Sequence, residues 1–282
     1  MSTRLTSYTR AGLEFDVVDS GPLDGPVVVA LHGFPQTATS LTELSGLLAE
    51  RGYRTLAPNQ RGYSPGARPR GRRAYRVPEL VDDVAALIET LDRGPVHLVG
   101  HDWGAMVAWA VAAARPELVS SLVTISVPHP GAFLRSLVSS DQLLRSYYIG
   151  LFQLPVLPEY LLRTRPTLLD RVLSSTGMPP EAKARVRTEI VDGGALTGGL
   201  NWYRGLPFGG LGGRAGRVRA PVTHVWSTGD TALTRRGAEL AGDYARGDYR
   251  LVVLDGASHW LPDEHPAELA GIIAERIEST RR

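Results

Sequence analysis

Short, continuously apolar segments alternate along the chain with segments whose apolar residues recur every three or four positions. The run 27–31 is apolar throughout, as in a buried strand, whereas 78–91 places its leucine, valine and isoleucine side chains on one helical face. Strands are expected at 14–19, 27–31, 54–58, 96–99, 118–127, 221–227 and 249–254, and helices at 41–50, 78–91, 103–114, 233–243 and 266–278. This alternation predicts an α/β fold with a mostly parallel, twisted sheet and helices on both faces.

The alternation stops between about residue 130 and residue 218, where the chain is rich in Leu, Arg and Gly. We interpret this stretch as a helical insertion between two strands of the sheet. The expected organisation is therefore a core whose first part is 1–129, a helical cap at 130–218, and the second part of the core at 219–282. The glycine-rich run 210–215 matches a dinucleotide-binding pattern weakly, but it follows no predicted strand and is expected to be a loop.

Composition narrows the class of protein. The 282 residues are 43% hydrophobic and 21% charged, as in a globular protein, and a net charge of +2 gives little support for a nucleic-acid partner. The absence of cysteine excludes disulfides, a thiol nucleophile and cysteine-bound metal, and we expect neither a cofactor nor a metal. The sequence has no apolar run of about 18 residues, and its first residues do not resemble a signal peptide. We therefore expect a cytoplasmic protein without a membrane span.

The run Gly100-His101-Asp102-Trp103-Gly104 carries the main chemical signal. It follows the predicted strand at 96–99 and precedes an alanine-rich helix, so it forms a sharp turn between the two. Glycines two residues before and after Asp102 are what a nucleophile elbow needs, because side chains there would collide with neighbouring backbone. Asp102 is therefore the candidate nucleophile. The alternative is that Asp102 merely caps the helix.

A second run, Gly62-Tyr63-Ser64-Pro65-Gly66, matches the serine elbow pattern G-x-S-x-G by its letters. An elbow uses the backbone N–H of the residue after the nucleophile to hold an oxyanion, and Pro65 has no N–H. The pattern is therefore expected to be without catalytic function. The arginine-rich stretch 67–76 that follows is expected to be a solvated loop, with a phosphate-binding loop as the alternative.

Three further residues complete a hydrolase-type site. Phe34 follows His-Gly directly after the strand 27–31, where its N–H and that of Trp103 would form an oxyanion hole. Asp230 follows the strand at 221–227, and His259 follows the last strand. Because the carboxyl ends of parallel strands meet at one edge of the sheet, these groups are expected near Asp102. The order nucleophile, acid, histidine is that of the α/β-hydrolase fold.

From about residue 10 onward the sequence resembles the epoxide hydrolases of the α/β-hydrolase fold. The resemblance is carried by residues 32–36, 61–64, 100–104 and 127–131 and by the segments around Asp230 and His259. Two cap segments, 146–153 and 200–204, resemble those that hold the catalytic tyrosines of the family, which implies Tyr148 and Tyr203. The alternative for each tyrosine is packing within the cap. The residues expected to bind substrate are Phe34, Trp103, Phe152 and Trp202.

The resemblance implies conversion of an epoxide to a vicinal diol, with a small-molecule epoxide and water as the partners. Asp102 would form an alkyl ester, Tyr148 and Tyr203 would protonate the epoxide oxygen, and His259, oriented by Asp230, would activate water. A haloalkane or haloacid (fluoroacetate-type) dehalogenase with the same Asp nucleophile is the alternative, which the tyrosine pair disfavours. A non-catalytic ligand binder of this fold is a second alternative. The sequence does not predict the oligomeric state.

Overall fold

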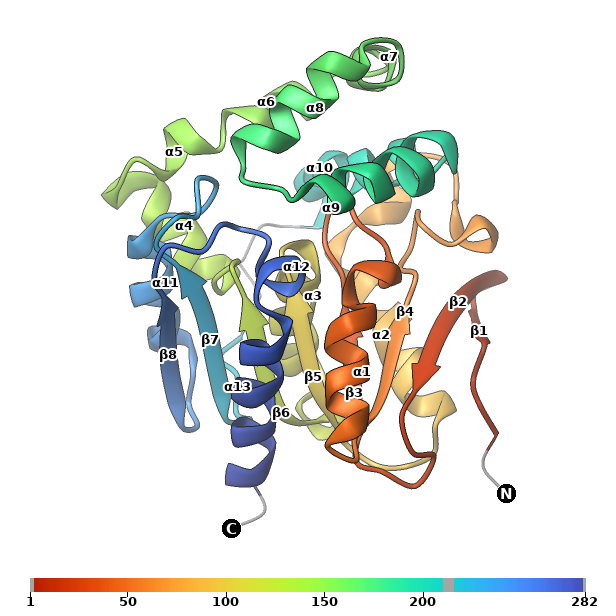
Figure 1. Ribbon diagram of the computed structural model, residues 1–282, viewed down its shortest axis with the longest axis vertical. Coiled ribbons are helices and arrows are strands. Elements are labelled where there is room, and N and C mark those ends of the chain that lie inside the picture. Colours follow the sequence, from red (N-terminus) through yellow and green to blue (C-terminus); the bar gives the residue numbers. More distant parts are fainter. Residues whose placement is uncertain (1–2, 210–215, 281–282) are drawn as a thin grey trace.

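The computed structural model describes residues 3–209 and 216–280, and these form one sheet covered by helices (Figure 1). The described residues contribute eight strands in the order β1-β2-β4-β3-β5-β6-β7-β8. Strands β3 to β8 pair in parallel with one another, whereas β1 pairs antiparallel with β2 and β2 with β4. The strands are β1 Ser7–Arg10, β2 Leu13–Ser20, β3 Val27–Leu31, β4 Arg54–Pro58, β5 Val96–His101, β6 Val119–Ile125, β7 Val222–Ser227 and β8 Tyr249–Leu254. The predicted fold class is confirmed.

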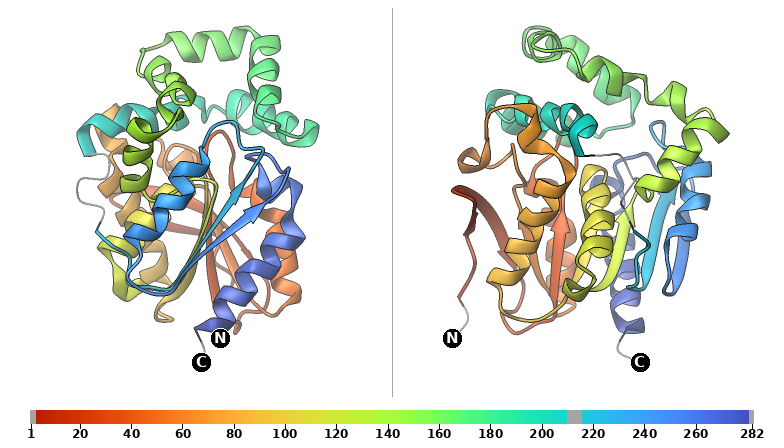
Figure 2. Two further views of the ribbon diagram at one scale, coloured as in Figure 1. Left: turned by 90° about the vertical axis from the view of Figure 1, so that its left-hand side faces the viewer. Right: turned by 180° about the vertical axis from the view of Figure 1, so that it is seen from behind.

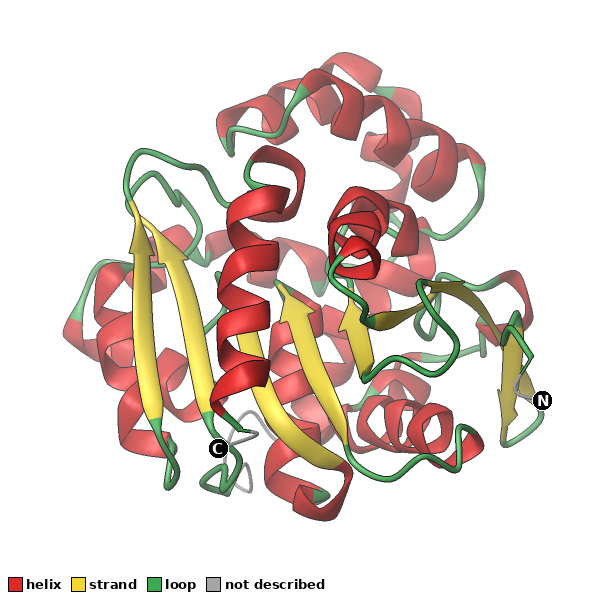
Figure 3. Ribbon diagram, turned by 60° about the horizontal axis from the view of Figure 1, so that its bottom comes forward, coloured by secondary structure: helices red, strands yellow, loops and turns green. Residues whose placement is uncertain are grey.

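Helices cover both faces of this sheet (Figure 3). On one face, α1 (Thr42–Glu50) and α13 (Pro266–Ser279) pack on alternate strand residues such as Val28. On the other, α2 (Val77–Thr90) and α3 (Trp103–Ala114) pack on the intervening residues such as Val29. Because both faces are covered, β3, β4 and β7 are buried at every position, which explains the continuous apolar run of β3.

The described chain between β6 and β7 is built from helices, turns and loops, and we call these helices the cap. They lie over the carboxyl ends of the parallel strands, as the side views show (Figure 2). They are α4 Pro130–Ser139, α5 Gln142–Arg145, α6 Tyr147–Phe152, α7 Leu157–Thr164, α8 Pro166–Ser175, α9 Pro180–Arg185, a π-helical segment Val186–Asp192 and α10 Leu196–Gly209. The domain boundaries at 129/130 and 218/219 stay a prediction, and the glycine-rich run 210–215 lies outside the described residues.

The remaining elements differ from the sequence-based expectation in two ways. The short edge strand β1 was not expected, because four residues that include Ser7, Thr9 and Arg10 give no apolar run. The helix expected at 233–243 is a shorter helix, α11 (Arg235–Leu240), followed by a 3₁₀ turn, and α12 (Leu261–Glu264) precedes α13. Among the described residues, no helix is both long and apolar enough to cross a membrane.

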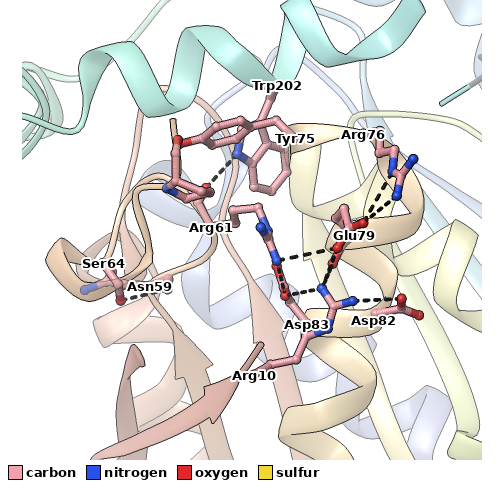
Figure 4. Close-up of polar contacts among 11 residues, drawn as sticks. Arg10, Asn59, Arg61, Ser64, Tyr75, Arg76, Glu79, Asp82, Asp83 and Trp202 are labelled. Atoms are coloured by element: carbon pink, nitrogen blue, oxygen red, sulfur yellow. Dashed lines mark hydrogen bonds and ion pairs between the residues drawn. The ribbon is translucent and has the colours of Figure 1, made fainter. Parts of the chain in front are cut away.

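A buried ion cluster joins β1, α2 and the loop after β4 (Figure 4). Arg61 makes two hydrogen bonds to Asp83, at 2.6 and 2.7 Å, and their side chains are only 4% and 5% exposed. Arg10 contacts Asp83, Glu79 and Asp82 at 2.9–3.0 Å. The carboxylate of Asp83 is therefore shared by two arginines from separate parts of the core, and Glu79 and Asp82 supply the further negative charge.

We expect Asp83→Asn to lower the free energy of unfolding by about 3 kcal/mol, because the buried Arg61 cation loses its closest anion. Urea unfolding measures this loss. Asp82→Asn is the matched control: Asp82 also binds Arg10 but is 51% exposed, so its loss should cost less than about 1 kcal/mol. Equal losses in the two variants would contradict the role assigned to Asp83.

Candidate active site

Asp102 occupies a strained turn between β5, which ends at His101, and α3. Its φ of +52° is rare for a residue with a side chain, and such a conformation costs about 1–3 kcal/mol. Glycines make the turn possible. A Cβ at Gly100 would lie 2.3 Å from the carbonyl oxygen of Gly104, and a Cβ at Gly104 would lie 2.2 Å from that of Leu31. The strain lifts the Asp102 side chain off the sheet.

The Asp102 carboxylate does not cap α3, so the helix-cap alternative does not describe its contacts. Instead, the backbone N–H of Phe34 donates to Asp102 Oδ1 at 2.7 Å. A backbone hydrogen bond from the N–H of Trp103 also lowers the pKa of the Asp102 carboxyl. Gly33 permits this approach, because a Cβ there would lie 2.4 Å from the Cβ of Asp102. The two backbone donors expected for an oxyanion hole therefore both face the candidate nucleophile.

His259 lies between two carboxylates. Its Nδ1 donates to Asp230 Oδ2 at 2.8 Å, and its Nε2 lies 3.4 Å from Asp102 Oδ2. The other oxygen of Asp230 accepts the backbone N–H groups of Ala232 and Leu233, each at 2.8 Å. The three residues named from the ends of three strands thus form a continuous Asp102–His259–Asp230 array, with the imidazole oriented from behind.

Charge and burial act in opposite directions on this array. Burial lowers the pKa of His259, but Asp230 and Asp102 outweigh burial and raise the pKa to about 10. Burial raises the pKa of Asp102, but the hydrogen bond and charge of His259 bring it below the usual range. At neutral pH the unreacted site therefore holds an ionised Asp102 beside a protonated His259.

The backbone of His259 is held by two residues that the sequence did not single out for this purpose. His101 Nε2 donates to the carbonyl oxygen of His259 at 2.9 Å, and Ser126 Oγ donates to the same oxygen at 3.0 Å. Burial lowers the pKa of His101 to about 4, so its ring stays neutral and acts as a fixed donor. The position of His101 inside the elbow motif was the available sequence signal.

A mainly apolar pocket of about 560 Å³, part of it open to solvent, lies over Asp102. Both candidate tyrosines, Tyr148 from α6 and Tyr203 from α10, line it, with their ring centroids 6.0 Å apart. Its lining residues are Asp102, Trp103, Met106, Val127, Pro128, Pro130, Phe133, Tyr148, Ile149, Tyr203, Leu206 and Leu233. The structure thus brings the cap tyrosines and the elbow to one cavity, where Asp102 is the only charged residue among the described lining.

Three residues expected to bind substrate lie beside this pocket rather than in its lining. Phe34 and Phe152 pack edge-on against Tyr203, with ring centroids 5.4 and 5.0 Å away. Trp202 points toward the core, where its Nε1 donates to the carbonyl oxygen of Arg61 at 2.7 Å (Figure 4). Of the four expected substrate contacts, Trp103 alone lines the described pocket. The direction of the Trp202 indole is set by the way α10 packs on the core.

Ser64, in the run that matches the serine elbow, has a structural role. Its side chain is fully buried, and Oγ donates to the carbonyl oxygen of Asn59 at 3.0 Å (Figure 4). A single 3₁₀ turn, Pro65–Ala67, follows instead of an α-helix. The serine is therefore a loop anchor, in agreement with the expectation from Pro65.

Comparisons with known proteins agree with this geometry. A family model described as alpha/beta hydrolase fold matches residues 26–266. The chain belongs to the α/β-hydrolase family. The AB hydrolase superfamily protein YfhM of Bacillus subtilis is 35% identical, with 95% of this chain and 96% of that protein aligned. Epoxide hydrolase A of Mycobacterium tuberculosis is 30% identical over 94% of each chain. The crystal structure of epoxide hydrolase A from Mycobacterium thermoresistibile matches with a TM-score of 0.82 and 28% identity, covering 96% of this chain and 97% of that one.

We expect Asp102→Asn to lower the pKa of His259 from about 10, because the variant loses one of the two negative charges that raise it. Titration of the imidazole resonances by NMR measures the change, and intact mass verifies that the side chain remains Asn. Asp263→Asn is the control, since Asp263 is a buried carboxyl that binds Gln36 and Arg185 rather than His259. An unchanged pKa in Asp102→Asn would contradict the electrostatic coupling.

Proposed function

We propose that this hydrolase converts epoxides to vicinal diols, with Asp102 as the nucleophile. One observation carries the proposal: the carboxylate residue Asp102 and two tyrosines, Tyr148 and Tyr203, line the same pocket. Opening an epoxide needs a nucleophile on carbon and an acid on oxygen, and this site offers both. Relatives that carry the name epoxide hydrolase and align over most of the chain support the same reaction.

In the first step, an oxygen of ionised Asp102 bonds to a ring carbon, and the bond between that carbon and the epoxide oxygen breaks. Tyr148 and Tyr203 supply the proton to the oxygen that leaves carbon. Burial raises the pKa of both phenols, so each remains protonated and able to donate. The products are an ester on Asp102 and a free hydroxyl on the former epoxide.

Alkylation then makes His259 a base. The ester carries no charge, so one of the two carboxylates that raise the pKa of His259 is lost. The proton that His259 releases replaces the one taken from the tyrosine pair. Neutral His259, still oriented by Asp230, can now accept a proton from water.

In the second step, that water adds to the carbonyl carbon of the Asp102 ester. The N–H groups of Phe34 and Trp103 hold the oxyanion that forms. Collapse of this intermediate breaks the ester bond, and the leaving alkoxide takes the proton of the hydroxyl that water brought. The diol is released, and Asp102 is again a carboxylate, with one oxygen from water. A serine elbow would take an acyl group from its substrate, whereas here the hydrolysed carbonyl belongs to the enzyme.

The pocket favours a neutral, apolar epoxide. Apart from Asp102, the described lining residues carry no charge, and most are aliphatic or aromatic. A haloacid would place its carboxylate against Asp102, and none of the described residues that line the pocket is a cation that could balance the two negative charges. This charge pattern favours an epoxide over a fluoroacetate-type substrate.

The direct test supplies styrene oxide, 1-chlorobutane and fluoroacetate separately and measures diol, chloride and fluoride. We expect diol from styrene oxide and little halide. Halide without diol would establish a dehalogenase instead, and the absence of every product would favour a ligand-binding protein. A single turnover in heavy-oxygen water is expected to label Asp102, and a label confined to the diol would exclude the ester intermediate.

We expect Tyr148→Phe and Tyr203→Phe each to slow formation of the ester by roughly 10- to 100-fold, because one of the two proton donors is lost. Hydrolysis of the ester should change little. Stopped-flow tryptophan fluorescence can separate these steps, since Trp103 lies beside Asp102. Tyr147→Phe is the matched control, because Tyr147 precedes Tyr148 but is exposed. If Tyr148→Phe and Tyr203→Phe both form the ester at the normal rate, another residue must protonate the epoxide oxygen.

A further inference from the structure

The acid loop, residues 230–234, is the part of the β7–α11 connection that carries Asp230 and leads into α11. The Asp230 carboxylate is bound by backbone N–H groups of its own loop, at Ala232 and Leu233. Its side chain therefore moves with the loop, and the placement of His259 depends on where the loop lies. Contacts that hold the acid loop in place therefore also hold the imidazole of His259 in its orientation.

Gln142 of α5 is bonded to this loop from the cap side. Its Nε2 donates to the carbonyl oxygen of Ala232 at 2.7 Å, and its Oε1 accepts the N–H of Thr234 at 2.8 Å. The residue is only 1% exposed, so water cannot replace these partners. The opposite orientation of the amide would face oxygen with oxygen and N–H with N–H, which fixes the orientation seen.

The second Nε2 hydrogen of Gln142 points in the other direction, toward the segment that carries Tyr148. It is donated to Ser146 Oγ at 3.0 Å, and Ser146 directly precedes α6. Tyr148 lies on the first turn of that helix. One buried amide therefore contacts both the acid loop and the base of the tyrosine helix.

Arg145 adds a separate contact between the same two segments. Its Nη1 donates to the backbone carbonyl oxygen of Asp230 at 3.0 Å, while its Nε pairs with Asp141 within the cap. The side chain is partly exposed, so it can be replaced with less disturbance than Gln142. Gln142 and Arg145 together form what we call the acid-loop clasp.

We propose that the acid-loop clasp is a positioning device in which Gln142 and Arg145 hold Asp230 in register with Tyr148. The clasp touches neither substrate nor the reacting atoms. It acts through Tyr148, which serves ester formation, and through Asp230, which orients His259 for ester hydrolysis. The proposal rests on the proposed function for its kinetic consequence. Its structural consequence, the strength of the Asp230–His259 hydrogen bond, is independent of any substrate.

The test compares Gln142→Met and Arg145→Met with the natural protein. The first variant keeps the side-chain length but removes all three hydrogen bonds, and the second removes the contact to Asp230. Arg68→Met is the matched control, because Arg68 also joins core to cap, at the Gly193 carbonyl oxygen, but touches neither segment. The readouts are the low-field proton resonance of His259 Nδ1–H, single-turnover rates with styrene oxide, and melting temperature.

We expect the His259 resonance to move upfield in both clasp variants and ester hydrolysis to slow about tenfold, because a small misplacement of a catalytic group costs that much or more. Ester formation should also slow in Gln142→Met, the variant that frees Ser146. Arg68→Met should leave resonance and rates unchanged. A lower melting temperature with resonance and rates unchanged would overturn the proposal, and Arg145→Met decides alone if Gln142→Met does not fold. A shifted resonance without turnover of epoxide would refute the proposed function and leave the clasp standing.

Discussion

The close approach of three backbone segments at Asp102 is the constraint on which the site depends. A φ of +52° is tolerated because β3, β5 and the start of α3 meet there with no Cβ between them. Gly33, Gly100 and Gly104 are the residues that make this contact possible, and a Cβ at any of the three would lie within about 2.4 Å of a neighbouring atom. The packing of the parallel sheet therefore stabilises a conformation that the turn alone would not hold. In return, the carboxylate stands clear of the sheet, where Phe34 and His259 reach it.

The charges around Asp102 also bear on the order of the two proposed steps, ester formation and ester hydrolysis. Two buried carboxylates and one imidazolium leave an excess of negative charge, which the N–H of Phe34 and the positive end of α3 partly compensate. This arrangement keeps Asp102 ionised and His259 protonated. In the proposed mechanism, esterification of Asp102 removes one negative charge and lets His259 lose its proton. His259 would then activate water only after Asp102 has formed the ester.

Sequence patterns predicted the core well because a strand that is buried on both faces, such as β3, is a continuous apolar run. The positions of the elbow, the acid and the histidine were predictable too, because each comes shortly after the end of a predicted strand. The walls of the pocket were not, because Phe133 and Leu233 come from segments whose meeting depends on tertiary packing. Trp202 shows the same limit: its presence in the cap was evident, but the bond of its indole to Arg61 depends on the seating of α10. Gln142 carried no signal, since a single glutamine has no motif.

The cap meets the core differently beside each of the two candidate tyrosines. On the Tyr203 side, α10 touches the core backbone directly: a Cβ at Gly198 would lie 2.2 Å from the carbonyl oxygen of Gly62. Such contact leaves no room for adjustment. On the Tyr148 side, the hydrogen bonds to the acid loop run through the buried amide of Gln142 and the partly exposed guanidinium of Arg145. The two tyrosines are thus held by different means, Tyr203 through contact between backbones and Tyr148 through side-chain hydrogen bonds. In the proposed mechanism, a substitution in the clasp therefore displaces the Tyr148 donor and leaves the Tyr203 donor in place.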